Sequence, residues 1–387
     1  MKYLAYGSQS IEKDDLKIVV KTLQSSHLTQ GPKIDEFEHK LCEYTGAKYA
    51  VAVNSGTAAL HCAYYALGLG SGDEVITSPM TFAATSNAAL YLGAKPVFVD
   101  VDPQTGCIDS DLIESKITPK TKLITVIDYG GQPVNFKKIN QIAKKHNLLV
   151  VDDACHALGA TYQKQILGKG NQALATILSF HPVKHITTGE GGALLTNDKS
   201  VYDKAIQFRS HGITKDANKF KNDSPGPWYH EMHLLGFNYR IPDILAALGI
   251  SQLKKMDTFL KRRRLIATQY DKAFRKNPYF DIPSKITDTQ HAYHLYPILL
   301  KDHLVAHKSQ LVKKLNERGI GTQVHYIPVY RHPYYQSLGY KLGTCPNAEA
   351  FYERELSIPM FPKLTDTDVK RVIRTILQTC KELTPTV

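Results

Sequence analysis

A lysine in a glycine-flanked stretch is the residue whose type and surroundings point most specifically to chemistry. Lys184 stands in Ser-Phe-His-Pro-Val-Lys-His-Ile-Thr-Thr-Gly-Glu-Gly-Gly (179–192), which joins two apolar segments. A lysine in an inward-facing loop loses water, which lowers the pKa of its amine toward the neutral form that Schiff-base chemistry requires. His181 and His185 are four residues apart, a spacing at which two histidines on a helix can bind a metal ion. Pro182 disfavours a regular helix there and no acidic third ligand is near, so we predict no metal site.

Two acidic residues end another apolar run, LLVVDD (148–153). Ligands bind at the carboxyl ends of strands in open α/β sheets, and a carboxylate there can hold a cationic ring nitrogen. Asp153 is suited to that role, and His156 can turn back toward the same ligand. A helix cap by Asp153 is the plainer alternative. A nucleophilic Cys155 paired with His156 is disfavoured, because adjacent residues in a strand point to opposite faces.

A phosphate-binding turn is predicted at Asn-Ser-Gly-Thr-Ala (54–58), which follows an apolar run and opens a helical stretch. Free backbone N–H groups and the helix dipole attract a phosphate at such a turn. Gly56 allows close approach, and Ser55 or Thr57 can donate a hydroxyl hydrogen bond. A purely structural helix cap is the alternative. Neither GxGxxG nor GxxxxGK[ST] occurs here, which argues against a standard dinucleotide or nucleoside-triphosphate site.

The elements that must position these residues alternate between short apolar runs and helical stretches from about residue 48 to residue 200. This alternation predicts βαβ units and a seven-stranded, mainly parallel sheet in an α/β fold. The expected strands are 48–53, 74–78, 95–101, 121–129, 148–153, 173–180 and 191–197.

After residue 238, long charged helical stretches and short strands indicate a smaller α+β domain. We predict a large domain at 1–250, with an N-terminal arm at 1–31, and a small domain at 251–387. No Gly/Ser/Pro linker separates them, so a long helix within 245–262 can belong to both.

Composition limits the class of protein. The 387 residues are 43% hydrophobic and 22% charged, as in folded globular chains, and no apolar run reaches the roughly 20 residues of a membrane span. With no secretory signal at the start, we expect a cytoplasmic protein without a membrane partner. Six cysteines without CxxC pairs predict free thiols. The net charge of +12 is spread along the chain, which argues against a nucleic-acid partner and fits phosphate-bearing ligands.

Four motifs in order, NSGTAAL, VVDDACHALGA, SFHPVKHITTGEGG and GFNYRIPD, resemble the sugar aminotransferases of the DegT/DnrJ/EryC1/StrS family over essentially the whole chain. The resemblance implies a fold-type I transferase that depends on pyridoxal 5'-phosphate, and a homodimer with shared active sites. It makes Lys184 the catalytic lysine that carries the cofactor and moves the proton. Asp152 departs from the glutamate that the family often has, but the following Asp153 is retained.

The same resemblance implies the cofactor contacts. Asp153 would hold the pyridine nitrogen, His156 would lie beside the phenolic oxygen, and Phe82 would lie against the ring face. Phosphate contacts would come from Gly56, Thr57, Ser179 and Asn238, the last reaching the cofactor of the partner subunit.

Segments outside the catalytic core, such as LTQG (28–31) and RGIGTQVHYIPVY (318–330), resemble the branch of the family that aminates C4 of a UDP-linked 4-keto-6-deoxy-N-acetylhexosamine. L-Glutamate is the expected amino donor. By analogy, the candidate UDP-sugar contacts are Tyr6, Thr29, Arg209, His325 and Tyr326. A core or interface role for Tyr326 and a structural ion pair for Arg209 remain open alternatives.

Another nucleotide-sugar aminotransferase of the same family is the main rival interpretation. A non-catalytic relative that binds the cofactor for regulation is disfavoured by Lys184 and by the lack of an appended DNA-binding segment. Family members that dehydrate sugars have histidine in place of this lysine, which disfavours that branch too.

Overall fold

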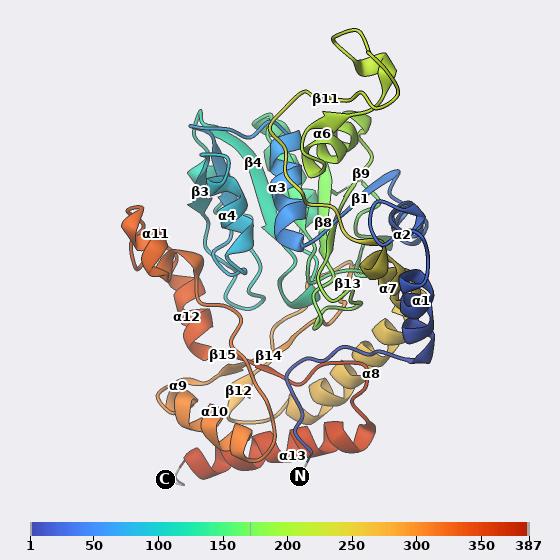
Figure 1. The fold of residues 1–387 in the computed structure, drawn as a ribbon. Helices are drawn as coiled ribbons and strands as arrows, with labels where there is room; N and C mark the ends of the chain where they lie inside the picture. Colours follow the sequence, from blue (N-terminus) through green and yellow to red (C-terminus); the bar gives the residue numbers. More distant parts are fainter. Residues whose placement is uncertain (1, 171, 385–387) are drawn as a thin grey trace.

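The central sheet is built from the seven apolar runs that the sequence predicts. The computed structural model describes residues 2–170 and 172–384. In the order β1-β9-β8-β5-β4-β2-β3, strands β8, β5, β4, β2 and β3 are parallel neighbours, and β9 is antiparallel to β1 and β8 (Figure 1). The strands are β1 (Tyr49–Val53), β2 (Glu74–Thr77), β3 (Lys95–Phe98), β4 (Thr121–Ile127), β5 (Leu149–Asp153), β8 (Ala175–Ser179) and β9 (Gly192–Thr196).

Both faces of this sheet are covered, which explains why its strands are apolar without polar alternation. Val51 and Val53 of β1 belong to the core beneath α3, α4 and α6, whereas Ala50 and Ala52 belong to the core shared with α2, α5 and α7. These helices are α2 (Pro32–Thr45), α3 (Gly56–Ala66), α4 (Ala84–Leu90), α5 (Phe136–Lys145), α6 (Lys199–Arg209) and α7 (Asp243–Leu253).

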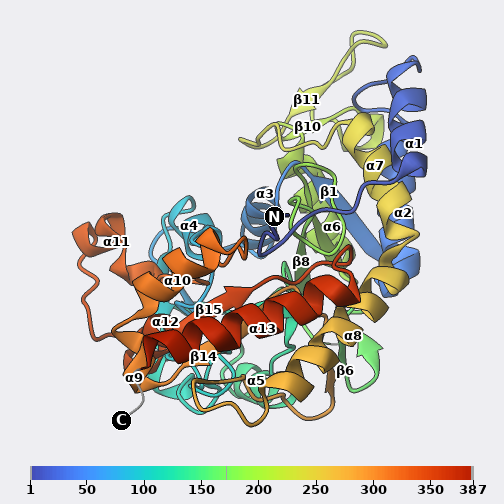
Figure 2. The same cartoon turned by 90° about the horizontal axis from the view of Figure 1, so that it is seen from below.

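A second hydrophobic core lies in the C-terminal part of the chain, around the three-stranded sheet β12-β14-β15 (Figure 1, lower half). Helix α8 contributes Met256 and Phe259 to the first core and Tyr270 and Phe274 to the second, while the division into domains at residue 250 stays a prediction. In the view from below, α13 crosses this region beside α10 (Figure 2). Its elements are α8 (Met256–Phe274), β12 (Phe280–Asp281), β14 (Tyr296–Leu300), α9 (Asp302–Val305), α10 (Lys308–Glu317), α12 (Pro346–Arg354), β15 (Glu355–Ile358) and α13 (Asp366–Leu383).

The first residues of the chain run along this second core before α1 (Lys13–Leu23) begins. Leu4 is buried there and pairs with Ile320, and the carbonyl of Tyr6 accepts a hydrogen bond from the Met360 N–H. This hydrogen bond anchors the backbone of Tyr6 to the second core.

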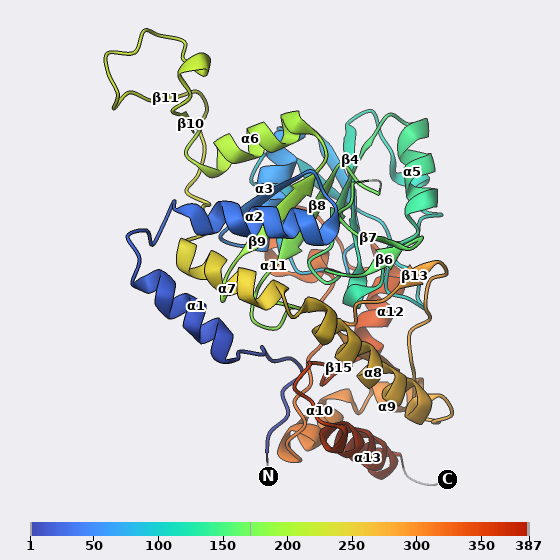
Figure 3. The same cartoon turned by 90° about the vertical axis from the view of Figure 1, so that its right-hand side faces the viewer.

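A hairpin-like arm projects from the body beyond α6 (Figure 3). It contains β10 (Ile213–Thr214) and β11 (Glu231–Met232). The remaining short elements are β6 (Thr161–Tyr162), β7 (Gln165–Ile166), β13 (Thr289–Gln290) and α11 (Pro333–Ser337). Within 2–170 and 172–384, no helix is both long and apolar enough to cross a membrane. All six cysteines are free thiols, as predicted.

Candidate active site

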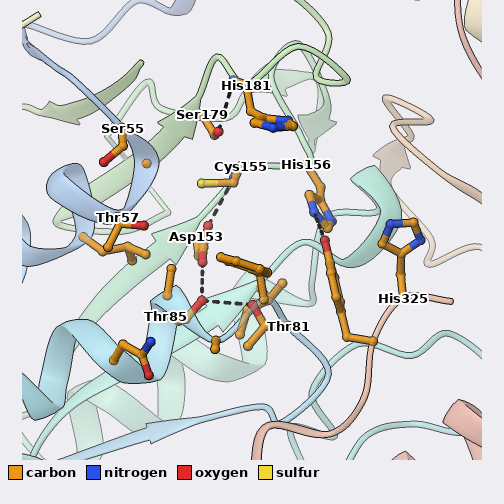
Figure 4. A pocket seen from close by; sticks show the side chains of 18 of the residues that line it. Ser55, Thr57, Thr81, Thr85, Asp153, Cys155, His156, Ser179, His181 and His325 are labelled. Atoms are coloured by element: carbon orange, nitrogen blue, oxygen red, sulfur yellow. Dashed lines mark hydrogen bonds between the residues drawn. The ribbon is translucent and has the colours of Figure 1, made fainter. Parts of the chain in front are cut away.

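A cavity of about 960 Å³ lies where β1, β5 and β8 end, and its wall is completed by the N-terminal segment and by residues 323–327. It brings together the three groups of residues that the sequence singled out, although they are far apart in the chain (Figure 4). The predicted site residues that line it are Tyr6, Gly56, Thr57, Phe82, Asp153, His156, Ser179, Lys184, His325 and Tyr326.

The start of α3 offers unpaired backbone donors to this cavity. Ser55 caps the helix, its hydroxyl oxygen accepting the N–H of Ala58 at 3.1 Å. The N–H groups of Gly56 and Thr57 find no acceptor among the described residues. A Cβ atom at Gly56 would lie 3.1 Å from the Ser179 Cβ, which is tighter than ordinary packing allows. Glycine therefore keeps a narrow, anion-attracting space open beside the Ser179 hydroxyl.

The Asp153 carboxylate is buried at the end of β5 and oriented by hydrogen bonds. Thr85 of α4 donates to its Oδ2 at 2.6 Å, and the Cys155 N–H donates to its Oδ1 at 3.3 Å. The Thr85 hydroxyl is also 2.9 Å from that of Thr81, so two threonines form a chain that ends on the carboxylate (Figure 4). This arrangement fixes the orientation of the Asp153 side chain in the cavity wall.

Lys184 reaches the cavity from the loop after β8 and is half-buried there. Among the described residues, no hydrogen-bond acceptor contacts its Nζ atom. Loss of water lowers the pKa of this amine, while Cys155 and Asp153 act in the opposite direction. The side chain thus meets the condition for a nucleophilic amine.

Neutral histidines line the remaining wall. His156 Nε2 lies 2.9 Å from the Tyr326 hydroxyl, and its ring stands 4.5 Å from that of His294, measured between centroids. Burial, followed by the nearby Lys184 charge, holds the pKa of His156 well below its ordinary value, and the same two causes act on His294. Both rings therefore act as hydrogen-bonding groups rather than as charges.

Comparison with known proteins identifies the family. A model described as the DegT/DnrJ/EryC1/StrS aminotransferase family matches residues 9–377. The chain belongs to that family. It is 44% identical to a UDP-4-amino-4,6-dideoxy-N-acetyl-beta-L-altrosamine transaminase of Campylobacter jejuni over 379 residues, covering 96% of each chain. It is 41% identical to the spore coat polysaccharide biosynthesis protein SpsC of Bacillus subtilis over 378 residues, which cover 97% of this chain and 96% of SpsC.

The fold is also that of a solved structure. PseC of Helicobacter pylori, an aminotransferase involved in the biosynthesis of pseudoaminic acid, superposes with a TM-score of 0.92 at 38% identity, covering 98% of this chain and 100% of PseC. The protein is thus a sugar aminotransferase with the fold-type I architecture that the resemblance implied, and it uses pyridoxal phosphate, as the family does.

The site of this aminotransferase fits that cofactor in its chemistry. A phosphate matches the free N–H groups of Gly56 and Thr57, and the Gly56 cradle leaves room for it. A protonated ring nitrogen matches the oriented Asp153 carboxylate, and an aldehyde matches the unpaired amine of Lys184. Phe82, with 65% of its surface exposed, offers a flat apolar face to a ring in the cavity.

Arg209 is not where the sequence comparison suggested. It lies outside the cavity lining, in a buried ion pair whose Nη1 atom is 2.5 Å from Glu38 Oε1 and 2.7 Å from the Ala52 carbonyl oxygen. A guanidinium enclosed in this way does not reach a diphosphate in this pocket. The structural ion pair, which the sequence left open, is what the chain forms.

Thr29 and Asn238 also lie outside the cavity of their own subunit, and both are exposed. Asn238 was predicted to reach the phosphate in the partner subunit, and that expectation stays a prediction. The sequence analysis missed the Thr81 and Thr85 chain, although both residues stand in the SPMTFAATSNA run that contains Phe82. A hydroxyl three residues after a predicted ring contact was the available signal.

Proposed function

We propose that the protein transfers the amino group of L-glutamate to C4 of a UDP-4-keto-6-deoxy-N-acetylhexosamine. The product is UDP-4-amino-4,6-dideoxy-N-acetyl-beta-L-altrosamine, a precursor of pseudaminic acid. The observation that carries the proposal is the similarity to the Campylobacter jejuni transaminase, with 44% identity over 96% of both chains. A cytoplasmic location stays a prediction.

The proposed cofactor contacts follow the cavity wall. Gly56, Thr57 and Ser179 would hold the phosphate, Asp153 would hold the pyridine nitrogen, and His156 would lie beside the phenolic oxygen. When bound, pyridoxal phosphate supplies an electron sink for the carbon that loses or gains a proton. Thr85 would support this chemistry indirectly, because its hydrogen bond fixes the orientation of the Asp153 carboxylate that would hold the ring nitrogen.

Lys184 has two tasks in this proposal. Its amine anchors the cofactor, and its Nζ atom carries the proton between the carbon of the donor or acceptor and the cofactor. A lowered pKa suits both tasks, since the amine must be able to give up a proton near neutral pH. His156 and His294 cannot take over this proton transfer, because their lowered pKa keeps both rings neutral near neutral pH.

The sugar nucleotide would occupy the part of the cavity that Tyr6, His325 and Tyr326 line, where the Tyr6 and His325 rings are 5.2 Å apart. Tyr334 also lines the cavity and is 63% exposed, so its ring can cover a flat part of a nucleotide. The site thus offers apolar faces together with few polar anchors, as is usual for small-molecule sites.

We also propose a homodimer. Leu16, Val20 and Leu23 form an exposed stripe along one side of α1, each with at least half of its surface exposed. Trp228 on the projecting arm is 73% exposed. Such apolar surface favours burial against another protein surface, and a second copy would also bring Asn238 to a phosphate. Light scattering should give twice the chain mass of 43.3 kDa.

Shared sites can be tested by complementation. Lys184→Ala and Asn238→Ala variants should each be impaired alone, and mixed dimers should regain activity because one site combines both native residues. A mixture no more active than its components would contradict the shared site.

A second candidate is another nucleotide-sugar 3- or 4-aminotransferase that serves lipopolysaccharide or glycan synthesis. The 41% identity to SpsC supports it. The decisive experiment incubates the holoenzyme with L-glutamate and each of several UDP- and dTDP-linked keto sugars, and identifies amino sugars by mass spectrometry. We expect turnover of the UDP-4-keto-6-deoxy-N-acetylhexosamine. Failure on that sugar with turnover of another would refute the first proposal and support the second.

A further inference from the structure

A buried carboxyl group is linked to the cavity through one serine. Glu355 and Ser357 lie on β15 without solvent exposure, and His325 lies in the cavity wall. The Ser357 hydroxyl is 2.5 Å from Glu355 Oε1 and 2.9 Å from His325 Nδ1. The other carboxyl oxygen, Oε2, accepts the backbone N–H of His325 at 2.7 Å. Glu355 therefore contacts the histidine twice, through its main chain and through the serine.

We call the hydrogen bonds from Glu355 through Ser357 to His325 the Glu355 relay. The relay has only one arrangement of hydrogens for each charge state of Glu355. The Ser357 hydroxyl has one hydrogen to give. When Glu355 is charged, that hydrogen goes to the carboxylate, and the serine oxygen must accept a hydrogen from His325 Nδ1. Burial lowers the pKa of His325 to about 3, so its ring is neutral and carries only one N–H group. The second nitrogen, Nε2, is then a bare acceptor.

Nε2 is the atom that the relay leaves for the ligand. Among the residues that the structure describes, it has no hydrogen-bonding partner, while the ring lines the cavity beside Tyr6 and Tyr326. Figure 4 shows His325 at the edge of the group formed by His156, Asp153 and the two threonines. We propose that Glu355 is a positioning residue that, through Ser357, makes His325 Nε2 accept a hydrogen bond from a hydroxyl or amide N–H group of the sugar. The inference rests on the proposed function, because it assigns a specificity contact to the same site.

A proton on Glu355 reverses the relay. With Oε2 occupied by the His325 N–H, the carboxyl hydrogen lies on Oε1 and points at Ser357, which then donates to Nδ1. His325 Nε2 then carries a hydrogen and can no longer accept one from the hydroxyl or amide N–H group of the sugar, so that hydrogen bond is lost. Hence the sugar should bind better as pH rises through the titration of Glu355.

The surroundings of Glu355 place its titration between about pH 7 and 9, the range that the experiment below covers. Burial raises the pKa of Glu355 to about 8, and its hydrogen bonds with Ser357 and His325 and the charge of Lys308 on α10 oppose the rise. Tyr129 and Tyr326 also face it, and both phenols stay neutral because burial raises their pKa well above the ordinary value. Lys308 donates to the Tyr352 carbonyl instead of forming a close ion pair with Glu355.

Glu355→Gln tests the relay with little change of shape. Its amide oxygen can accept the His325 N–H while its amide N–H₂ donates to Ser357, which copies the protonated state at every pH. We expect the KM for the UDP-4-keto sugar at pH 9 to rise about fivefold to tenfold, the worth of one hydrogen bond. The rate of the glutamate half-reaction should stay within about twofold. Wild type should show a falling sugar KM between pH 7 and 9, and the variant should show none.

A spectroscopic readout separates this inference from the choice of sugar. In ¹⁵N-histidine-labelled holoenzyme at pH 9, with His325 assigned through a His325→Asn variant, the wild-type hydrogen should lie on Nδ1 and that of Glu355→Gln on Nε2. The same tautomer in both proteins would overturn the inference, whatever sugar is the substrate. If Glu355→Gln does not fold, Ser357→Ala decides, because retention of the wild-type pH dependence of the sugar KM in that variant would overturn it as well.

Discussion

Arg209→Met should destabilise the protein without affecting sugar binding, because the structure puts Arg209 in a buried ion pair outside the cavity. Both side chains of the Arg209–Glu38 pair are 11% exposed. The substitution leaves the Glu38 carboxylate with the Ala52 N–H, 2.8 Å from Oε1, as its remaining hydrogen bond. Breaking such a pair by removing one partner costs about 3–5 kcal/mol. We expect that loss in the free energy of unfolding at pH 8, measured by urea denaturation.

The loss should depend on pH with a defined sign. Burial raises the pKa of Glu38 even with Arg209 present, and removing the guanidinium must raise it further. A carboxyl group whose pKa is raised by folding stabilises the folded protein only while it is protonated. The stability lost by Arg209→Met therefore grows as pH rises above the pKa of Glu38 in the unfolded chain. Arg209→Met should therefore lose less stability at pH 5 than at pH 8. Glu38→Gln in the same chain should restore much of the loss.

Lys199→Met is the matched control, because it removes one positive charge from the same helix. Its ion pair with Asp203 is exposed, so water and salt screen it and we expect almost no change in stability. In Arg209→Met itself, the KM for the sugar nucleotide should equal the wild-type value. A tenfold rise in KM together with unchanged stability would refute the structural assignment and return Arg209 to the diphosphate.

Three further predictions concern the cavity and its support. Thr85→Val should lower the free energy of unfolding by about 1.5–3 kcal/mol, as expected for a hydrogen bond to a charged group, and should weaken cofactor binding. Thr85→Ser should keep the wild-type stability and cofactor affinity. Equal behaviour of the two variants in denaturation and cofactor titration would contradict this. Gly56→Ala should weaken cofactor binding about tenfold in fluorescence titration, since the added Cβ would lie 3.3 Å from Cys155 Sγ and 3.1 Å from Ser179 Cβ. An unchanged affinity would show that the space around Gly56 is not tight. Burial raises the pKa of Asp128, which is paired with the equally buried Asp152, so the stability that comes from the proton of this pair is present at low pH and is lost as pH rises through the titration of the pair in the folded state. Asp128→Asn should flatten this decline, and parallel stability curves would argue against it.

The sheet and the main site residues could be predicted because their signals are local. Each strand is a short apolar run, and Asp153, Ser179 and the turn before Gly56 directly follow such runs, so sheet geometry brings them together. The structure confirms this convergence.

Contacts between distant segments could not be predicted, because no local pattern encodes them. Thr85 meets Asp153 across 68 positions, and Glu38 meets Arg209 across 171. Nothing near Arg209 distinguishes an arginine that pairs inside the fold from one that binds phosphate. The Glu355 relay depends in the same way on the approach of residues 323–327 to β15, which arises only from tertiary packing.

The central claim is that Lys184 carries pyridoxal phosphate in an aminotransferase, and borohydride reduction of the holoenzyme followed by peptide mass spectrometry tests it most directly. The reduced cofactor should be found on the peptide that contains Lys184, and prior addition of L-glutamate should abolish the labelling by converting the cofactor to its aminated form. Labelling at another lysine, or a Lys184→Ala variant that transaminates at the wild-type rate, would contradict the claim.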